Sequence, residues 1–159
     1  MTAMQLSDAD ARQWLRLRRL RVERARQALG RAQDDERRAR TAVSDREARI
    51  ELSRTRLDDL ARQWGGAGSV DMPRWGAQLK AHREALAERL ERDEYALIDE
   101  QDALRRAEAV VAERRTELTR AQAREDAVDA TLKDHRQQTR QAHERRVELE
   151  AEDATRALT

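Results

Sequence analysis

The fold is decided by the stretch Trp64-Gly-Gly-Ala-Gly-Ser-Val-Asp-Met-Pro-Arg-Trp75, which separates two long charged segments. Glycine tolerates the left-handed backbone angles that end a helix, and proline has the fixed φ angle that suits the first turn of a new one. Signals that end one helix and begin another therefore lie next to each other. We expect a turn near residues 65–73 that uses Gly65, Gly66, Gly68 and Pro73.

Both segments have the composition of long helices and not of a globular core. Of the 159 residues 41% are charged and only 3% are aromatic, with no phenylalanine. Alanine, leucine, arginine, glutamate and glutamine dominate, and these residues are strong helix formers. The composition predicts an all-α chain without a layered domain.

The first segment repeats every seven residues without interruption. One column is mostly bulky and the other is mostly alanine. The bulky column is Leu15, Val22, Leu29, Glu36, Val43, Ile50, Leu57 and Trp64, and its companion is Ala11, Arg18, Ala25, Ala32, Ala39, Arg46, Ser53 and Leu60. A strict period of seven indicates the seam of a coiled coil, because an amphipathic globular helix has a broader stripe of period 3.6.

The second segment resumes the same period after Pro73. Its columns are Leu90, Leu97, Leu104, Val111, Leu118, Glu125 and Leu132, and Leu79, Leu86, Asp93, Glu100, Ala107, Arg114, Ala121, Val128 and His135. We therefore predict two long helices that form an antiparallel coiled-coil hairpin. Residues 1–159 would form a single elongated hairpin, with helix 1 at about 8–63, the turn at 64–73, and helix 2 at about 74–150 with a frayed C-terminal end.

Two registers satisfy these columns. In an antiparallel pair of helices, one residue of each helix lies at the same level along the axis, and the numbers of two such residues add up to a constant. The columns allow this sum to be 136 or 143. The sum of 136 sets small residues against large ones, as with Ala39 and Leu97, but it brings Glu36 near Glu100. The sum of 143 avoids that clash but sets Val43 near Glu100. Size complementarity favours 136, and 143 stays open.

The sequence offers no residues for catalysis, cofactors or metal. The glycine-rich stretch lacks the lysine and the preceding strand of a phosphate-binding loop. No two histidines lie three or four residues apart, and the chain has no cysteine to support a metal site or a disulfide. We expect a protein that is not an enzyme.

Membrane insertion and secretion are not expected either. No apolar stretch approaches the roughly 20 residues that cross a bilayer. The N-terminus also lacks the apolar run of a signal peptide. These features favour a cytoplasmic protein.

Charge and exposure suggest two partner-binding surfaces. Residues 12–31 contain eight arginines and one acid, and residues 84–102 contain eight acids and two arginines. Apolar or aromatic side chains fall outside the seam in both stretches. The candidate residues for partner binding are Trp14, Leu17, Leu20, Arg18 and Arg21 in the basic stretch, and Tyr95 and Ile98 in the acidic stretch.

The stretch Trp14-Leu-Arg-Leu-Arg-Arg-Leu-Arg-Val-Glu-Arg-Ala-Arg-Gln-Ala-Leu-Gly-Arg-Ala-Gln33 resembles the opening of the type III secretion central stalk family, the YscO/FliJ-like proteins, including those of plant-pathogen Hrp systems. The resemblance extends along the chain in its length, its mid-chain turn and its longer second helix. It implies a virulence-associated stalk that inserts into a hexameric secretion ATPase and links it to the export gate protein. The stalk would be cytoplasmic and peripheral to the inner-membrane secretion apparatus. The resemblance also allows other secretion components as partners.

Two other interpretations remain. The same heptads suit a structural coiled-coil adaptor that self-associates as a homo-oligomer, unrelated to an ATPase. The arginines of residues 12–31 also suit a nucleic-acid clamp, but they lack interleaved aromatic residues and a recognised nucleic-acid-binding fold. We therefore expect a protein partner and no nucleic acid.

Overall fold

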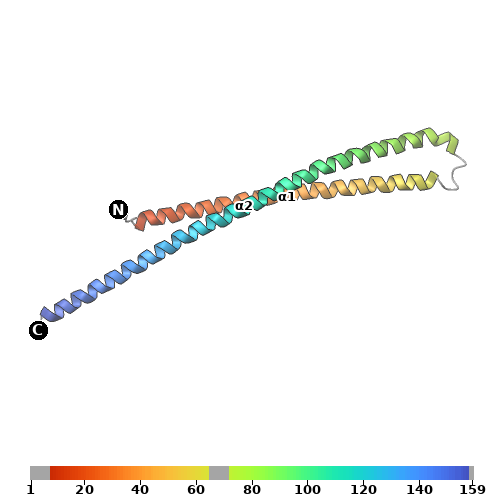
Figure 1. The fold of residues 1–159 in the computed structure, drawn as a ribbon. Helices are drawn as coiled ribbons and strands as arrows, with labels where there is room; N and C mark the ends of the chain where they lie inside the picture. Colours follow the sequence, from red (N-terminus) through yellow and green to blue (C-terminus); the bar gives the residue numbers. More distant parts are fainter. Residues whose placement is uncertain (1–7, 65–71, 158–159) are drawn as a thin grey trace. The chain divides into compact units, whose positions relative to one another are not determined.

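Two long helices account for every residue that the computed structural model describes, which are residues 8–64 and 72–157 (Figure 1). Helix α1 spans Asp8–Trp64 and helix α2 spans Met72–Ala157. The helices pack against each other and run in opposite directions. The all-α class and the helical hairpin predicted from the heptads are confirmed.

The helix ends differ from the predicted ones mainly in α2. Pro73 lies in the first turn of α2, as its fixed φ angle suggested. Helix α2 continues to Ala157 instead of ending near residue 150. Alanine-rich sequence sustains this last part, and the Thr155 hydroxyl donates a hydrogen bond of 2.9 Å to the carbonyl of Ala151. The predicted turn residues Gly65, Gly66 and Gly68 lie outside the described residues.

The contacts divide the chain into two compact units, each with one stretch of either helix. We call Met1–Leu29 with Arg114–Thr159 the terminal unit, and Gly30–Glu113 the central unit. The seam is described in each unit separately below.

Burial follows the predicted columns in both units. Every column position of α1 is buried or half-buried, and so is every column position of α2 except His135, which is exposed. The most buried apolar residues are all column members, each at most 8% exposed: Val22, Ala32, Ile50, Leu86, Val111 and Leu132. The coiled-coil seam predicted from the period of seven therefore holds together each unit.

In the observed register the numbers of residues at the same level add up to 143, so the prediction that favoured 136 was wrong. In the central unit Arg46 bonds to Asp93 on one side and to Glu100 on the other, pairs whose numbers add up to 139 and 146. These values bracket 143. If residues at the same level added up to 136, Arg46 would be level with Leu90, ten residues from Glu100. At about 1.5 Å per residue that is about 15 Å along the axis, which is too far for an ion pair. In the terminal unit Arg19 pairs with Glu125 at 3.4 Å, again close to a sum of 143.

Candidate interaction surfaces

The first candidate surface lies on α1 in the terminal unit. Trp14, Leu17 and Leu20 each leave about half of their surface exposed, at 49%, 48% and 50%. Arg21 is exposed beside them, whereas Arg18 is half-buried at a seam position. We call these five residues the basic surface. The exposure predicted for Trp14, Leu17 and Leu20 is confirmed, and Arg18 is half-buried as its seam column predicts.

Arg18 nevertheless contributes to the basic surface through Trp14. Its guanidinium carbon lies 5.5 Å from the centroid of the Trp14 ring. At that distance the positive charge is attracted by the face of the aromatic ring, which is worth about 0.5–1 kcal/mol at an exposed site. The contact links the seam to the indole and limits the orientations that Trp14 adopts.

A shallow depression adjoins the basic surface on the side of Leu20. It has a volume of about 440 Å³, and its walls come from both helices of the terminal unit: Arg16, Arg19, Leu20, Val22, Glu23, Arg26 and Glu125. The ion pair between Arg19 and Glu125 crosses it. The mixture of an apolar edge and several guanidinium groups suits an acidic protein surface with an apolar anchor.

The second candidate surface lies on α2 in the central unit. Tyr95 is 66% exposed and Ile98 is 54% exposed, as predicted. Their acidic neighbours are partly engaged already. Glu94 forms an ion pair of 2.8 Å with Arg54 of α1, and Asp102 pairs with Arg105. Less acidic charge is therefore available here than the sequence suggested.

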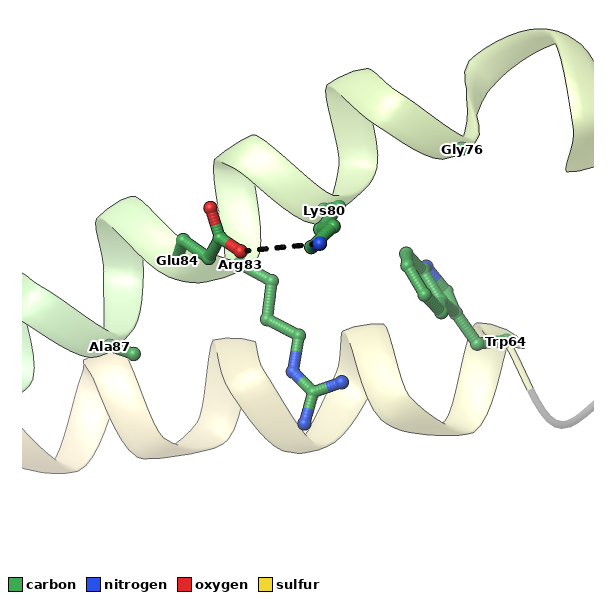
Figure 2. A pocket seen from close by; sticks show the side chains of 6 residues that line it. All are labelled: Trp64, Gly76, Lys80, Arg83, Glu84 and Ala87. Atoms are coloured by element: carbon green, nitrogen blue, oxygen red, sulfur yellow. Dashed lines mark ion pairs between the residues drawn. The ribbon is translucent and has the colours of Figure 1, made fainter.

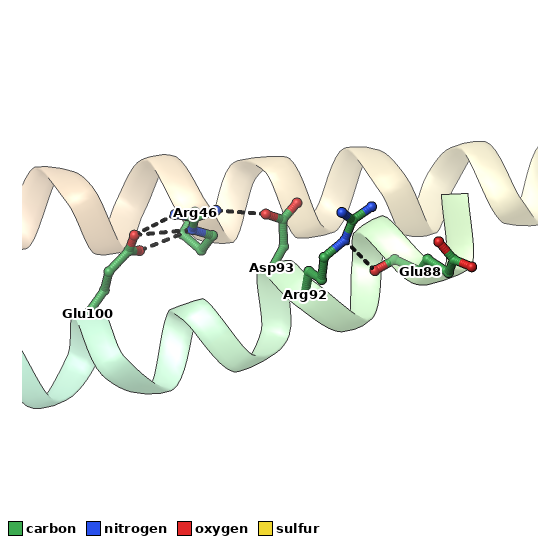
Figure 3. Close-up of polar contacts among 5 residues, drawn as sticks. All are labelled: Arg46, Glu88, Arg92, Asp93 and Glu100. Carbon is green, nitrogen blue, oxygen red and sulfur yellow. Dashed lines mark hydrogen bonds and ion pairs between the residues drawn. The ribbon is translucent and has the colours of Figure 1, made fainter. Parts of the chain in front are cut away.

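A polar network that the sequence analysis did not identify lies in the seam of the central unit (Figure 3). Arg46 donates one hydrogen bond of 2.7 Å to Asp93 Oδ1 and another of 2.7 Å to Glu100 Oε1. Its Nε donates to both Glu100 oxygens at 3.2 Å. Arg46, Asp93 and Glu100, which we call the Arg46 network, have side chains only 20%, 13% and 23% exposed.

The Arg46 network also favours the protonated form of the Arg46 guanidinium. Its hydrogen bonds, first to Glu100 and then to Asp93, raise the pKa of Arg46 above its ordinary value. The arginine therefore stays charged at any pH at which the protein is handled. All three residues occupy seam columns. An arginine in a seam column of one helix and carboxylates in a seam column of the other were therefore the signal that could have revealed the network.

A third feature lies near the end of α1. Trp64 extends its indole toward α2 and lines a depression of about 630 Å³ (Figure 2). Across from it, Lys80 and Glu84 of α2 form an ion pair of 3.9 Å. Among the described residues, the indole Nε1 of Trp64 is buried without a hydrogen-bond partner. Trp64 is the last residue of its seam column, so packing explains its position.

Trp75, which flanks the predicted turn, is 56% exposed. Four further apolar residues, which are scattered over both helices, are between 41% and 60% exposed: Leu52, Val110, Val147 and Leu149. The last two lie in residues 133–156 of α2, where every residue is exposed. Single exposed apolar residues are common on protein surfaces and indicate no site by themselves.

The described ranges, 8–64 and 72–157, contain no candidate metal site or membrane span. No group of three histidine, aspartate or glutamate side chains there is placed to hold a metal ion. Neither helix, over the same residues, is long and apolar enough to cross a membrane.

Comparison with known proteins adds no relative. No family model, no curated protein and no solved structure matches the chain. The surfaces described above are therefore the basis on which we argue a function.

Proposed function

We propose that the chain is the non-enzymatic stalk of a type III secretion system. In this proposal the hairpin inserts into the hexameric secretion ATPase and couples it to the export gate protein. It acts in the cytoplasm, peripheral to the inner-membrane secretion apparatus. The role requires only a stiff element with binding surfaces, so it needs no catalytic residue, cofactor or metal.

The observation that supports this proposal most is the basic surface. Three large apolar side chains lie half exposed within the segment that carries eight arginines and one acid. Tryptophan and arginine are frequent among the residues that dominate the energy of protein interfaces, where an apolar anchor fills a pocket and charges fix the orientation. The proposed socket is an acidic, partly apolar surface inside the ATPase ring.

The proposed mechanism follows from symmetry. A single hairpin within a six-fold ring contacts subunits that are chemically identical but differently placed around it. Each contact stabilises one conformation of its subunit over another, so the stalk biases which subunit binds or hydrolyses ATP. The hairpin contributes differential binding, and the ATPase contributes the chemistry.

Removing the apolar anchors tests the proposal. Leu17→Ala combined with Leu20→Ala leaves every charge in place, and both side chains point away from the seam. We expect binding to the purified secretion ATPase to weaken by about 1–3 kcal/mol, roughly 5-fold to 150-fold in Kd, because anchors that fill a pocket contribute that much. Helicity measured by circular dichroism should not change.

A matched control uses equally exposed residues elsewhere. Leu52→Ala with Val110→Ala removes two side chains that are 50% and 41% exposed in the central unit. This variant should bind the ATPase like the unchanged chain. Both variants should be compared at two salt concentrations and also tested against duplex DNA.

The outcomes distinguish the three functions. Salt-sensitive DNA binding in all variants, without affinity for the ATPase, would instead support the nucleic-acid clamp. Concentration-dependent self-association without ATPase binding would support the structural adaptor. Either result would refute the stalk.

A further inference from the structure

The apolar columns alone do not explain the register of the central unit. In the observed register Asp93 is level with Ile50, and Glu100 is level with Val43, so two carboxylates face apolar side chains. In the register with a sum of 136, Ile50 would face Leu86 and Val43 would face Asp93, so one carboxylate instead of two would face an apolar side chain. Apolar packing by itself therefore favours a register that the central unit does not adopt.

The ion pairs of the Arg46 network compensate for the two carboxylates that face apolar side chains in the observed register. Its three side chains are between 13% and 23% exposed, and Arg46 bonds to both carboxylates at 2.7 Å. In the other register Arg46 would be level with Leu90, three residues from Asp93, so it would keep Asp93 within reach but lose Glu100, which would face Glu36. Charges held in a narrow seam without their partners are costly, because they lose water and gain no bond in return. The network thus opposes the preference of the apolar columns.

We infer that the Arg46 network is a register lock, which holds the central unit in one of two coiled-coil registers that its columns allow. Without the lock, α2 slides along α1 by one heptad, which is about 10 Å at about 1.5 Å per residue. A slide of one heptad moves each seam residue into the next equivalent hole, so the coiled coil is kept in both states.

Sliding changes the surface that both helices form together. The exposed ion pairs Arg40 to Glu108, at 3.4 Å, and Arg54 to Glu94, at 2.8 Å, belong to the observed register only. Tyr95, exposed on α2, would also face solvent beside a different part of α1. A partner that contacts both helices of the central unit binds one register more tightly than the other and shifts the population toward it. This property does not depend on the identity of the partner.

Disulfide trapping reports the register directly, since the chain has no cysteine of its own. Ala39→Cys with Leu104→Cys places two thiols at the same level in the observed register. Ala39→Cys with Leu97→Cys places them level only after the slide. The mismatched pair is displaced by about 10 Å along the axis, and a disulfide requires Cα atoms within about 7 Å. With Arg46 in place, we expect only the Ala39 to Leu104 pair to oxidise.

Removing the lock should release the second product. With Arg46→Leu in the background, the Ala39 to Leu97 disulfide should rise from background to a yield comparable with that of the Ala39 to Leu104 disulfide. Arg46→Lys keeps a cation in the seam and should keep the Ala39 to Leu97 product at background. Arg54→Leu is the matched control, because it removes an ion pair between the same helices whose side chains are 54% and 45% exposed.

A second variant covers the case in which Arg46→Leu does not fold. Arg46→Leu with Asp93→Asn and Glu100→Gln leaves no uncompensated charge in the seam, and it should also yield both disulfides. Helicity by circular dichroism identifies the folded variants. If folded chains without the network form only the Ala39 to Leu104 disulfide, the register is fixed by something else and the inference is overturned. Appearance of the Ala39 to Leu97 product with Arg54→Leu would overturn it as well.

Discussion

Burial changes sharply between neighbouring residues of α1, because only one face of the helix meets α2. Ile50 is 4% exposed, whereas Leu52, two positions later, is 50% exposed. We expect Ile50→Ala to lower the free energy of unfolding by about 2–3 kcal/mol, since it removes buried methylene groups and leaves a cavity. Urea unfolding followed by circular dichroism measures this change.

Leu52→Ala is the control for Ile50→Ala, because it shortens an exposed side chain on the same helix. Its side chain stays half exposed in the folded chain, so the free energy of unfolding should change by less than about 0.5 kcal/mol. Equal losses for Ile50→Ala and Leu52→Ala would mean that the seam is not where the heptad columns place it.

The sequence predicts which candidate residues are exposed, because exposure follows from their position relative to the heptad columns. Trp14, Leu17 and Tyr95 fall outside a strict seven-residue period, and the structure leaves them exposed. Arg18 belongs to a seam column, and its contact with Trp14 depends on a side-chain orientation that spacing does not encode. Which partner covers these residues stays a prediction.

At the scale of the element, α1 contains one glycine, and glycine is the poorest helix former after proline. Gly30 lies inside the helix, its φ angle is not positive, and a Cβ atom added there meets nothing within 4 Å. Gly30→Ala should therefore raise the free energy of unfolding by about 0.5–1 kcal/mol, because alanine loses less backbone freedom on folding. The increase would appear as a higher urea midpoint with an unchanged slope.

The converse substitution tests the same reasoning. Ala48 is exposed on α1, so Ala48→Gly removes no buried surface and should lower the free energy of unfolding by about 1 kcal/mol. If Gly30→Ala destabilised the protein instead, helix propensity would not be what limits α1 at this position.

The elements themselves could be predicted almost completely, but their register could not. Bulky residues spaced by seven define which face is buried, and that face is the one observed. The choice between 136 and 143 depended on whether Asp93 and Glu100 meet a cation, and size complementarity says nothing about this. His135 continues its column but is exposed, because its level in the observed register coincides with Asp8, where α1 begins. Periodicity within one helix cannot show where the other helix ends.

At the scale of the whole molecule, charge is divided between the helices. Residues 1–64 carry 16 arginines and 11 acids, and residues 65–159 carry 17 basic residues and 21 acids. Several ion pairs between the described helices use this difference, with arginine on α1 and a carboxylate on α2: Arg19 with Glu125, Arg40 with Glu108, Arg46 with Asp93 and Glu100, and Arg54 with Glu94. Part of the asymmetry that suggested partners is thus satisfied within the chain.

This pairing within one chain leads to the last prediction. Helix α1 ends at Trp64 and α2 begins at Met72, so the connection is short and holds the two helices at an effective concentration of about millimolar. At about micromolar protein, pairing within the chain should therefore exceed pairing between chains by about a thousandfold. Leu57→Cys with Leu86→Cys places two thiols level in the 143 register, and their disulfide should form within single chains. Denaturing electrophoresis without reductant, followed by mass spectrometry, identifies the product. Mainly intermolecular disulfides would show that the helices pair between copies, and would favour the self-associating adaptor over the stalk.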